Sequence, residues 1–277
     1  MEYTEENYDF KKAIGQIIKD DFTPLLRANG FKKYGSHRYI QERSELVQVI
    51  GYSLGVAELK MWASVFPLCG TIEQIMNNGE YGINLMGCDG WKLLGGKYYT
   101  TMYGEPWAKK AVQLKLFYEK NQVGMQKLLE AIRLGVLPEF DRVNSFECFV
   151  ELFGQKKPVF MGWEFNGEHT AGFGCYKYVA AVQTCKNGDF QTGIRLLKEQ
   201  KQEWMCAALD HYKMKRSYLL PQSKEVVRNI RLLLTPEVKG QALTHETFRR
   251  NYELLCNEKR EKLKLIKKRS KGGDIKC

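Results

Sequence analysis

The closest approach to a catalytic arrangement in this sequence is the pair Glu58 and Lys60. Residues two apart on a strand share a face, and some nucleases use such a glutamate to bind Mg²⁺ and such a lysine to support the attacking water. That design also needs an aspartate on the neighbouring strand, and residues 46–52 contain no carboxylate. We therefore favour an exposed charge pair at a strand edge, and a metal-dependent nuclease is the least unlikely enzyme. No catalytic residue is assigned.

The residues that commonly bind metals or cofactors are spread thinly along the chain. No two of the four histidines lie three or four positions apart, and the eight cysteines form no C-x-x-C pair. Local spacings of that kind build most zinc sites. Gly96 and Lys97 lack the neighbouring glycine and the Ser or Thr that a phosphate-binding loop requires. We expect neither a metal nor a cofactor.

Lysines repeatedly stand beside aromatic residues, as in "FKKY" at 31–34 and "HYKMKRSY" at 211–218. Such pairs can stack bases and hold phosphates, but Lys and Tyr also border cores while keeping a polar tip in water. For 31–34 we favour a turn that joins a helix to a sheet and leaves two lysines for a partner. The predicted binding residues are Lys32, Lys33, Trp62, Lys213, Lys215 and Arg216.

The net charge of +11 lies almost entirely in the second half of the chain and is densest after residue 258. A basic tail of this kind is compatible with nucleic acid or another polyanion as a partner. No run of eighteen apolar residues is present, so we expect no membrane association. The acidic start "MEYTEENYDF" does not resemble a secretory signal, so we expect a cytoplasmic protein with free thiols.

The first hundred residues predict a helix followed by strands. Apolar residues recur at helical spacing from Phe10 to Leu26, and Gly30 is suited to end the helix in a left-handed conformation. Period-two runs then predict strands at 37–42, 46–52 and 59–66 and a more irregular strand pair at 90–103.

The rest of the chain is helical in pattern. We predict a helix behind Pro106, one closed by Gly135, and one capped by Asn144 or Ser145. An αα-hairpin is predicted over 181–200 around Asn187-Gly188-Asp189, followed by separate helices near 204–212 and 224–234. The last helix begins at Thr244 and is expected to dock as far as about Glu258 and then project or fray.

The predicted fold class is α+β, with an N-terminal helix packed on an antiparallel sheet and a mostly α-helical C-terminal half. The predicted organisation is a helix-plus-sheet domain at 1–105, a helical region packed on it at 106–258, and a basic tail at 259–277.

The order of helix, Gly30-Phe31-Lys32-Lys33 and hairpin resembles a bacterial family catalogued as domain of unknown function 4304. Matching positions include Leu25, Leu26, Tyr39 and the "LVQV" of 46–49, and the similarity covers about residues 8–155. The resemblance implies a fold and no active site, with toxin-immunity or interaction roles suspected for relatives of this kind. The segment 181–200 is similar to one tetratricopeptide-type hairpin, but no second copy follows.

Three interpretations remain open. We favour a non-catalytic, cytosolic protein-interaction or toxin-immunity-type protein with an unknown protein partner. The first alternative is a nucleic-acid-associated protein that uses its basic C-terminal half, and the second is an uncharacterised enzyme.

Overall fold

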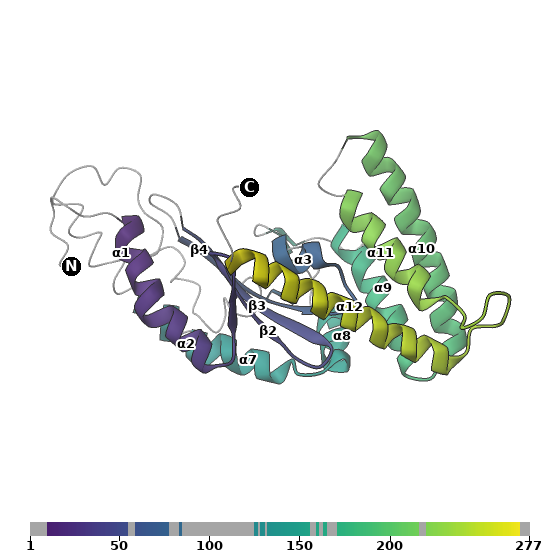
Figure 1. The fold of residues 1–277 in the computed structure, drawn as a ribbon, viewed down its shortest axis with the longest axis horizontal. Helices are drawn as coiled ribbons and strands as arrows, with labels where there is room; N and C mark the ends of the chain where they lie inside the picture. The colour runs from purple at the N-terminus through teal and green to yellow at the C-terminus, as the bar shows by residue number, and fades with distance from the viewer. Residues whose placement is uncertain are drawn as a thin grey trace. The chain divides into compact units, whose positions relative to one another are not determined.

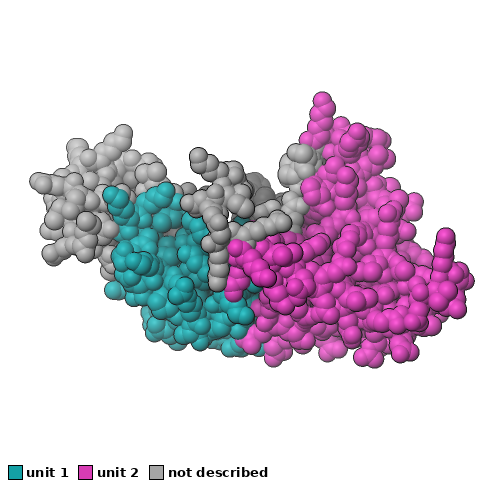
Figure 2. Space-filling model, viewed as in Figure 1, with its two compact units in different colours: residues 1–41, 48–64, 84–142 teal, residues 42–47, 65–83, 143–277 magenta. Residues whose placement is uncertain are grey.

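The computed structural model describes residues 10–54, 59–77, 83–84, 125–126, 128–130, 132–155, 159–160, 163–164, 171–215 and 220–271. The fold class is α+β, as the sequence predicts (Figure 1). The chain divides into two compact units. Unit 1 comprises 1–41, 48–64 and 84–142, and unit 2 comprises 42–47, 65–83 and 143–277 (Figure 2).

The N-terminal helix contains a π-helical turn. α1 (Phe10–Ile17) continues through η1 (Ile18–Phe22) into α2 (Thr23–Ala28). Pro24 stands in the first turn of α2, where its missing N–H costs no hydrogen bond. The helix ends at Gly30, whose φ of 82° is the left-handed conformation that the sequence predicts for it.

The stretch 31–34 is a strand rather than the turn that we expected. β1 (Lys32–Tyr34) pairs antiparallel with β2 (Arg38–Glu42), and Lys33 lies opposite Tyr39. The prediction was wrong because the chain leaving Gly30 runs directly back along β2. Phe31 and Tyr34 are buried while Lys32 and Lys33 stay exposed, so the two lysines do remain available to a partner.

The remaining predicted strands are confirmed. β3 (Leu46–Leu54) and β4 (Leu59–Pro67) are neighbours in one antiparallel sheet, which runs in chain order from β1 to β5 (Ile83–Asn84). The irregular strand pair predicted at 90–103 lies outside the described residues.

The core of unit 1 forms where helices meet the sheet. The rings of Phe22 and Tyr39 make an edge-to-face contact at 5.4 Å, and Tyr39 shares a 2.6 Å hydrogen bond with Thr23. Gln48 donates to the Phe140 carbonyl oxygen at 2.7 Å, and Phe140 contacts Phe31. These contacts tie the sheet to α2 and to α7 (Leu137–Arg142).

Gly135 does not close a helix as predicted. It lies inside the π-helical turn η2 (Ile132–Val136), which continues directly into α7. The glycine is buried, and an absent side chain suits a close approach as well as a helix end. The cap predicted at Ser145 is confirmed, because its hydroxyl accepts from the Cys148 N–H at the start of α8 (Phe146–Gln155).

Unit 2 contains the predicted αα-hairpin and a short β-hairpin, β6 (Val159–Phe160) with β7 (Trp163–Glu164). After α9 (Ala171–Lys186) the chain turns at Gly188. The Asp189 side chain then caps α10 (Phe190–Lys213) by accepting a hydrogen bond from the Thr192 N–H. A methyl group on Gly193 would lie 2.3 Å from the Cys185 sulfur, so the two helices require glycine at this crossing.

α10 is one helix, so the separate helix predicted near 204–212 is wrong. No proline or glycine lies between 200 and 204 to end the helix, so the helix that we predicted to end at Gln200 continues to Lys213. α11 (Leu220–Leu233) carries Pro221 in its first turn. It anchors the turn after β4, since Asn229 donates to the carbonyl oxygens of Cys69 and Gly70 just before α3 (Ile72–Asn77).

The last helix is longer and better packed than predicted. α12 (His245–Lys271) continues far beyond Glu258, with Lys259 and Leu263 fully buried. The expectation of a frayed basic tail from residue 259 is therefore wrong for the part of it that the structure describes. The buried Leu263 supplies an apolar contact in this part of the helix.

Candidate functional site

The predicted binding lysines Lys32 and Lys33 lie side by side on the exposed part of β1. The Lys33 ammonium is 5.9 Å from the centre of the Tyr39 ring, at the outer limit of a cation–π contact. Both residues belong to unit 1. Trp62 lies on β4, and its side chain is outside the description.

The other predicted basic residues belong to the end of α10 in unit 2. Lys213 is the last residue of the helix, and Lys215 follows with a φ of 54°; both side chains are exposed. Arg216 and Glu58 lie outside the described residues, as does the glycine-rich segment 87–104. The structure thus brings Lys213 and Lys215 together but leaves the nuclease-type pair without a described partner for Lys60.

A hollow of about 470 Å³ lies between α10 and α11, close to these lysines. Three large apolar side chains of α10 line it at helical spacing and are about half exposed or more: Met205 is 46% exposed, Leu209 52% and Tyr212 70%. Spacings of four and three residues place the three on one face of the helix. We call the hollow and its walls the α10–α11 groove.

The opposite wall of the groove is basic. Lys224, Arg228 and Arg231 line it at the same helical spacing along α11, and all three are exposed. Arg228 forms an ion pair with Glu258 at 2.5 Å. Within the part of the chain described here, Lys224 and Arg231 have no ion-pair partner, so their charges are available to a ligand.

Buried residues hold the two walls in place. Leu197 and Trp204 on α10, and Val226 and Ile230 on α11, are buried. His211 Nδ1 lies 3.1 Å from the Ser223 hydroxyl and forms a polar link between the helices. The groove is therefore built on packed helices rather than on loops.

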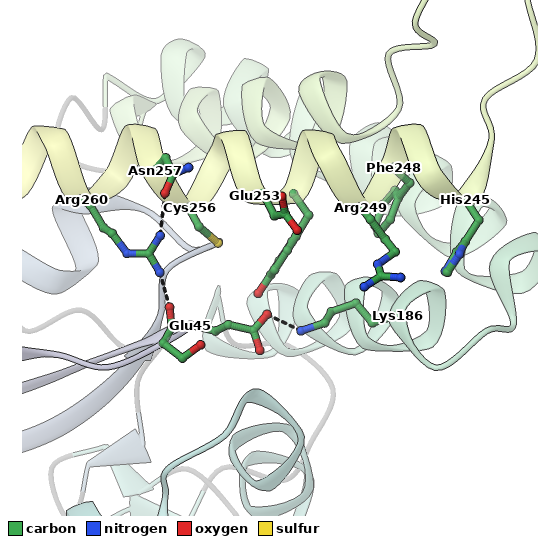
Figure 3. Close-up of a pocket in the computed structure, with 11 residues that line it drawn as sticks. Glu45, Lys186, His245, Phe248, Arg249, Glu253, Cys256, Asn257 and Arg260 are labelled. Carbon is green, nitrogen blue, oxygen red and sulfur yellow. Dashed lines mark hydrogen bonds and ion pairs between the residues drawn. The ribbon is translucent and has the colours of Figure 1, made fainter.

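A second hollow, of about 630 Å³, lies along the first half of α12. Its lining residues all belong to unit 2: Ser44, Glu45, Lys186, His245, Phe248, Arg249, Tyr252, Glu253, Cys256, Asn257 and Arg260. Figure 3 shows His245 and Arg249 extending from α12 towards the helix that carries Lys186. We call this hollow the α12 cavity.

The polar groups at the ends of the α12 cavity are fixed by their partners. Lys186 forms an ion pair with Glu45, and its ammonium lies 4.6 Å from the Phe146 ring centre and 4.8 Å from that of Tyr252. Arg260 donates to the Ser44 carbonyl oxygen and, at 2.7 Å, to Asn257. Because Lys186 and Arg260 are each bound by more than one group, these two side chains are preorganised.

Burial sets the protonation of the groups deepest in the α12 cavity. It raises the pKa of Tyr252 far above its usual value, with the neighbouring Cys69, Cys256 and Glu45 adding to the effect. Burial likewise raises the pKa of the Cys256 thiol to about 11. Both groups are therefore neutral near pH 7.

Sequence reasoning missed both hollows. The α12 cavity brings together Glu45, Lys186 and Arg249, which are far apart in the chain, so no local spacing could reveal it. The groove did leave a local signal, because Met205, Leu209 and Tyr212 repeat at helical spacing.

Among the described residues, no three His, Cys, Asp or Glu side chains gather where they could bind a metal. None of the described helices is both long enough and apolar enough to cross a membrane. In comparisons with known proteins, the chain matches no protein-family model, no curated protein and no solved structure.

Proposed function

We propose that this protein is a protein-interaction module whose docking surface is the α10–α11 groove. The observation that carries the proposal is the exposed row Met205, Leu209 and Tyr212 beside an open hollow. Large apolar side chains gathered on a rigid surface commonly mark sites of protein–protein interaction. Met and Tyr are also residue types enriched at such surfaces.

The shape and charge of the groove favour one kind of partner. A groove whose two walls are helices suits an amphipathic helix. Such a helix inserts into the groove apolar side chains that are spaced three, four and seven residues apart. Lys224 and Arg231, which have no ion-pair partner among the described residues, favour acidic residues beside that apolar stripe. The occupant that we propose is therefore an acidic amphipathic helix of another protein.

The experiment is a selection of helical peptides from a displayed library on the full chain. Selected peptides should share an apolar stripe and acidic flanks, and fluorescence anisotropy then gives their Kd. Their binding should weaken at least about tenfold on Leu209→Ser, since loss of a buried leucine contact costs about 1.5–3 kcal/mol. Leu254→Ser is the matched control, because Leu254 is 49% exposed on α12, outside the groove.

Three results would contradict the proposal. The library could yield no binder, the selected peptides could lack an apolar stripe, or they could bind Leu209→Ser as tightly as the unmodified chain. Concentration-dependent dimerisation that Leu209→Ser abolishes would replace the partner helix by a second copy of this chain.

The resemblance to the family of unknown function supports a narrower proposal, in which the partner is a toxin that this protein neutralises. Such a partner would lose its activity at an equimolar ratio, and Leu209→Ser would restore that activity. We further propose a cytoplasmic location, which the free thiols of Cys185, Cys206 and Cys256 support.

A further inference from the structure

We propose that the α12 cavity is a binding site for a small phosphate-bearing anion, with Arg249 as its principal ligand. The volume of about 630 Å³ is within the range of small-molecule sites. The site is separate from the α10–α11 groove, since the two hollows share no lining residue.

Arg249 differs from Lys186 and Arg260, the other lysine or arginine side chains of the cavity, in having no polar partner among the described residues. It has no hydrogen bond or ion pair with any residue that the structure describes, and its side chain lies on the cavity wall (Figure 3). The adjacent Arg250 differs, because it donates to Glu237 at 2.9 Å. A guanidinium that lines a cavity without a carboxylate partner can bind a phosphate group through two parallel N–H groups.

The surrounding charges are compatible with an anion. The carboxylate of Glu45 is neutralised by its ion pair with Lys186. Arg260 adds a positive charge at the Ser44 end of the cavity. Glu253, one turn after Arg249 on α12, also lines the cavity and opposes an anion; both side chains are exposed, so water screens both charges.

The hydroxyl of Tyr252 is a second polar group that a ligand in the cavity could contact. The residue is only 5% exposed and lines the cavity, where its hydroxyl lies next to the carboxylate of Glu45 and the thiol of Cys256 without a well-formed hydrogen bond to either. Buried hydroxyl groups nearly always have a partner. This hydroxyl remains protonated, so it can donate to an anion's oxygen.

His245 fixes the other end of the cavity. Its Nε2 donates to the Cys185 carbonyl oxygen at 3.1 Å, and its ring makes an edge-to-face contact with Phe190. These contacts hold the start of α12 against the α9–α10 hairpin. Arg249, one helical turn further along α12, is thus presented from a fixed helix.

The test is isothermal titration calorimetry of the full chain with inorganic pyrophosphate at constant ionic strength. The unmodified protein and the control Arg250→Gln should bind, and Arg249→Gln should bind at least about tenfold more weakly. Tyr252→Phe should weaken binding about fivefold, because the variant cannot donate a hydrogen bond to the anion. Circular dichroism verifies that each variant is folded.

Citrate, titrated in the same way, separates phosphate from multivalent carboxylates. We expect weaker binding of citrate than of pyrophosphate, and equal binding would overturn the assignment to phosphate. The site itself is refuted if pyrophosphate produces no binding heat, or if Arg249→Gln and Arg250→Gln bind it equally. Neither outcome bears on peptide binding in the α10–α11 groove.

Discussion

Lys259, which is fully buried on α12, forms an ion pair with Glu225 of α11. The other carboxylate oxygen of Glu225 accepts from the Ile72 N–H at 3.1 Å, at the first residue of α3. One carboxylate therefore joins three helices of unit 2. Burial lowers the pKa of Lys259, and the nearby charge of Glu225 opposes that shift.

Removing one member of this pair should be strongly destabilising. Lys259→Ala leaves Glu225 without its buried partner, and such losses typically cost about 3–5 kcal/mol. We expect chemical denaturation to show a fall of that size in the free energy of unfolding. The exposed Lys264→Ala, which breaks a pair with Glu261, is the control and should change it far less, because water screens an exposed pair. Similar values for the two variants would contradict the buried-pair account.

The second prediction concerns the C-terminal part of α12. Leu263 is fully buried and Leu265 is 52% exposed, two positions away on the same helix. Leu263→Ala should cost about 2–5 kcal/mol because it creates a cavity, and Leu265→Ala should cost much less. Thermal unfolding monitored by circular dichroism compares the two. Equal melting temperatures would mean that the helix projects after all.

The helix α12 illustrates which parts of this fold could be predicted from the sequence. Strong local signals succeeded: the helix stop at Gly30, the cap at Ser145, the hairpin turn at Gly188 and the alternation of β3 and β4 each depend on neighbours in the chain. We did not predict the features that depend on residues distant in the chain. Lys259 can be buried only because Glu225 pairs with its charge. β1 forms only by pairing with β2, where Lys33 lies opposite Tyr39.

The same distinction applies to the candidate sites. Lys213 and Lys215 were chosen for their local composition, and they lie at the end of α10 near the groove without lining it. The residues that do line the α10–α11 groove come from two helices whose mutual packing the sequence does not specify. A surface formed between elements requires their tertiary arrangement.

The third prediction concerns thiol reactivity. Burial raises the pKa of Cys185 to about 12 and that of Cys256 to about 11, so neither forms a thiolate near pH 8. Cys206 is exposed on α10. Mass-spectrometric mapping after brief alkylation of the native protein should find Cys206 labelled and the other two unlabelled. Equal labelling of Cys185 and Cys206 would refute the burial of Cys185.

The fourth prediction is a loss of stability at high pH through Tyr52. Its hydroxyl donates to the Ser36 carbonyl oxygen at 3.0 Å, and burial raises its pKa to about 12. An unfolded tyrosine ionises near pH 10, so the folded state binds the additional proton between about pH 10 and 12. The free energy of unfolding should therefore fall as pH rises through that window, and Tyr52→Phe should fall less steeply. Parallel pH profiles for the two proteins would rule out this contribution.

The central claim is that the α10–α11 groove binds an acidic amphipathic helix. Its most direct test is the Kd of one selected helical peptide for three proteins: the unmodified chain, Leu209→Ser and Leu254→Ser. The account predicts binding at least about tenfold weaker for Leu209→Ser and an unchanged Kd for Leu254→Ser. An unchanged Kd for Leu209→Ser, or an equal loss in both variants, would contradict it.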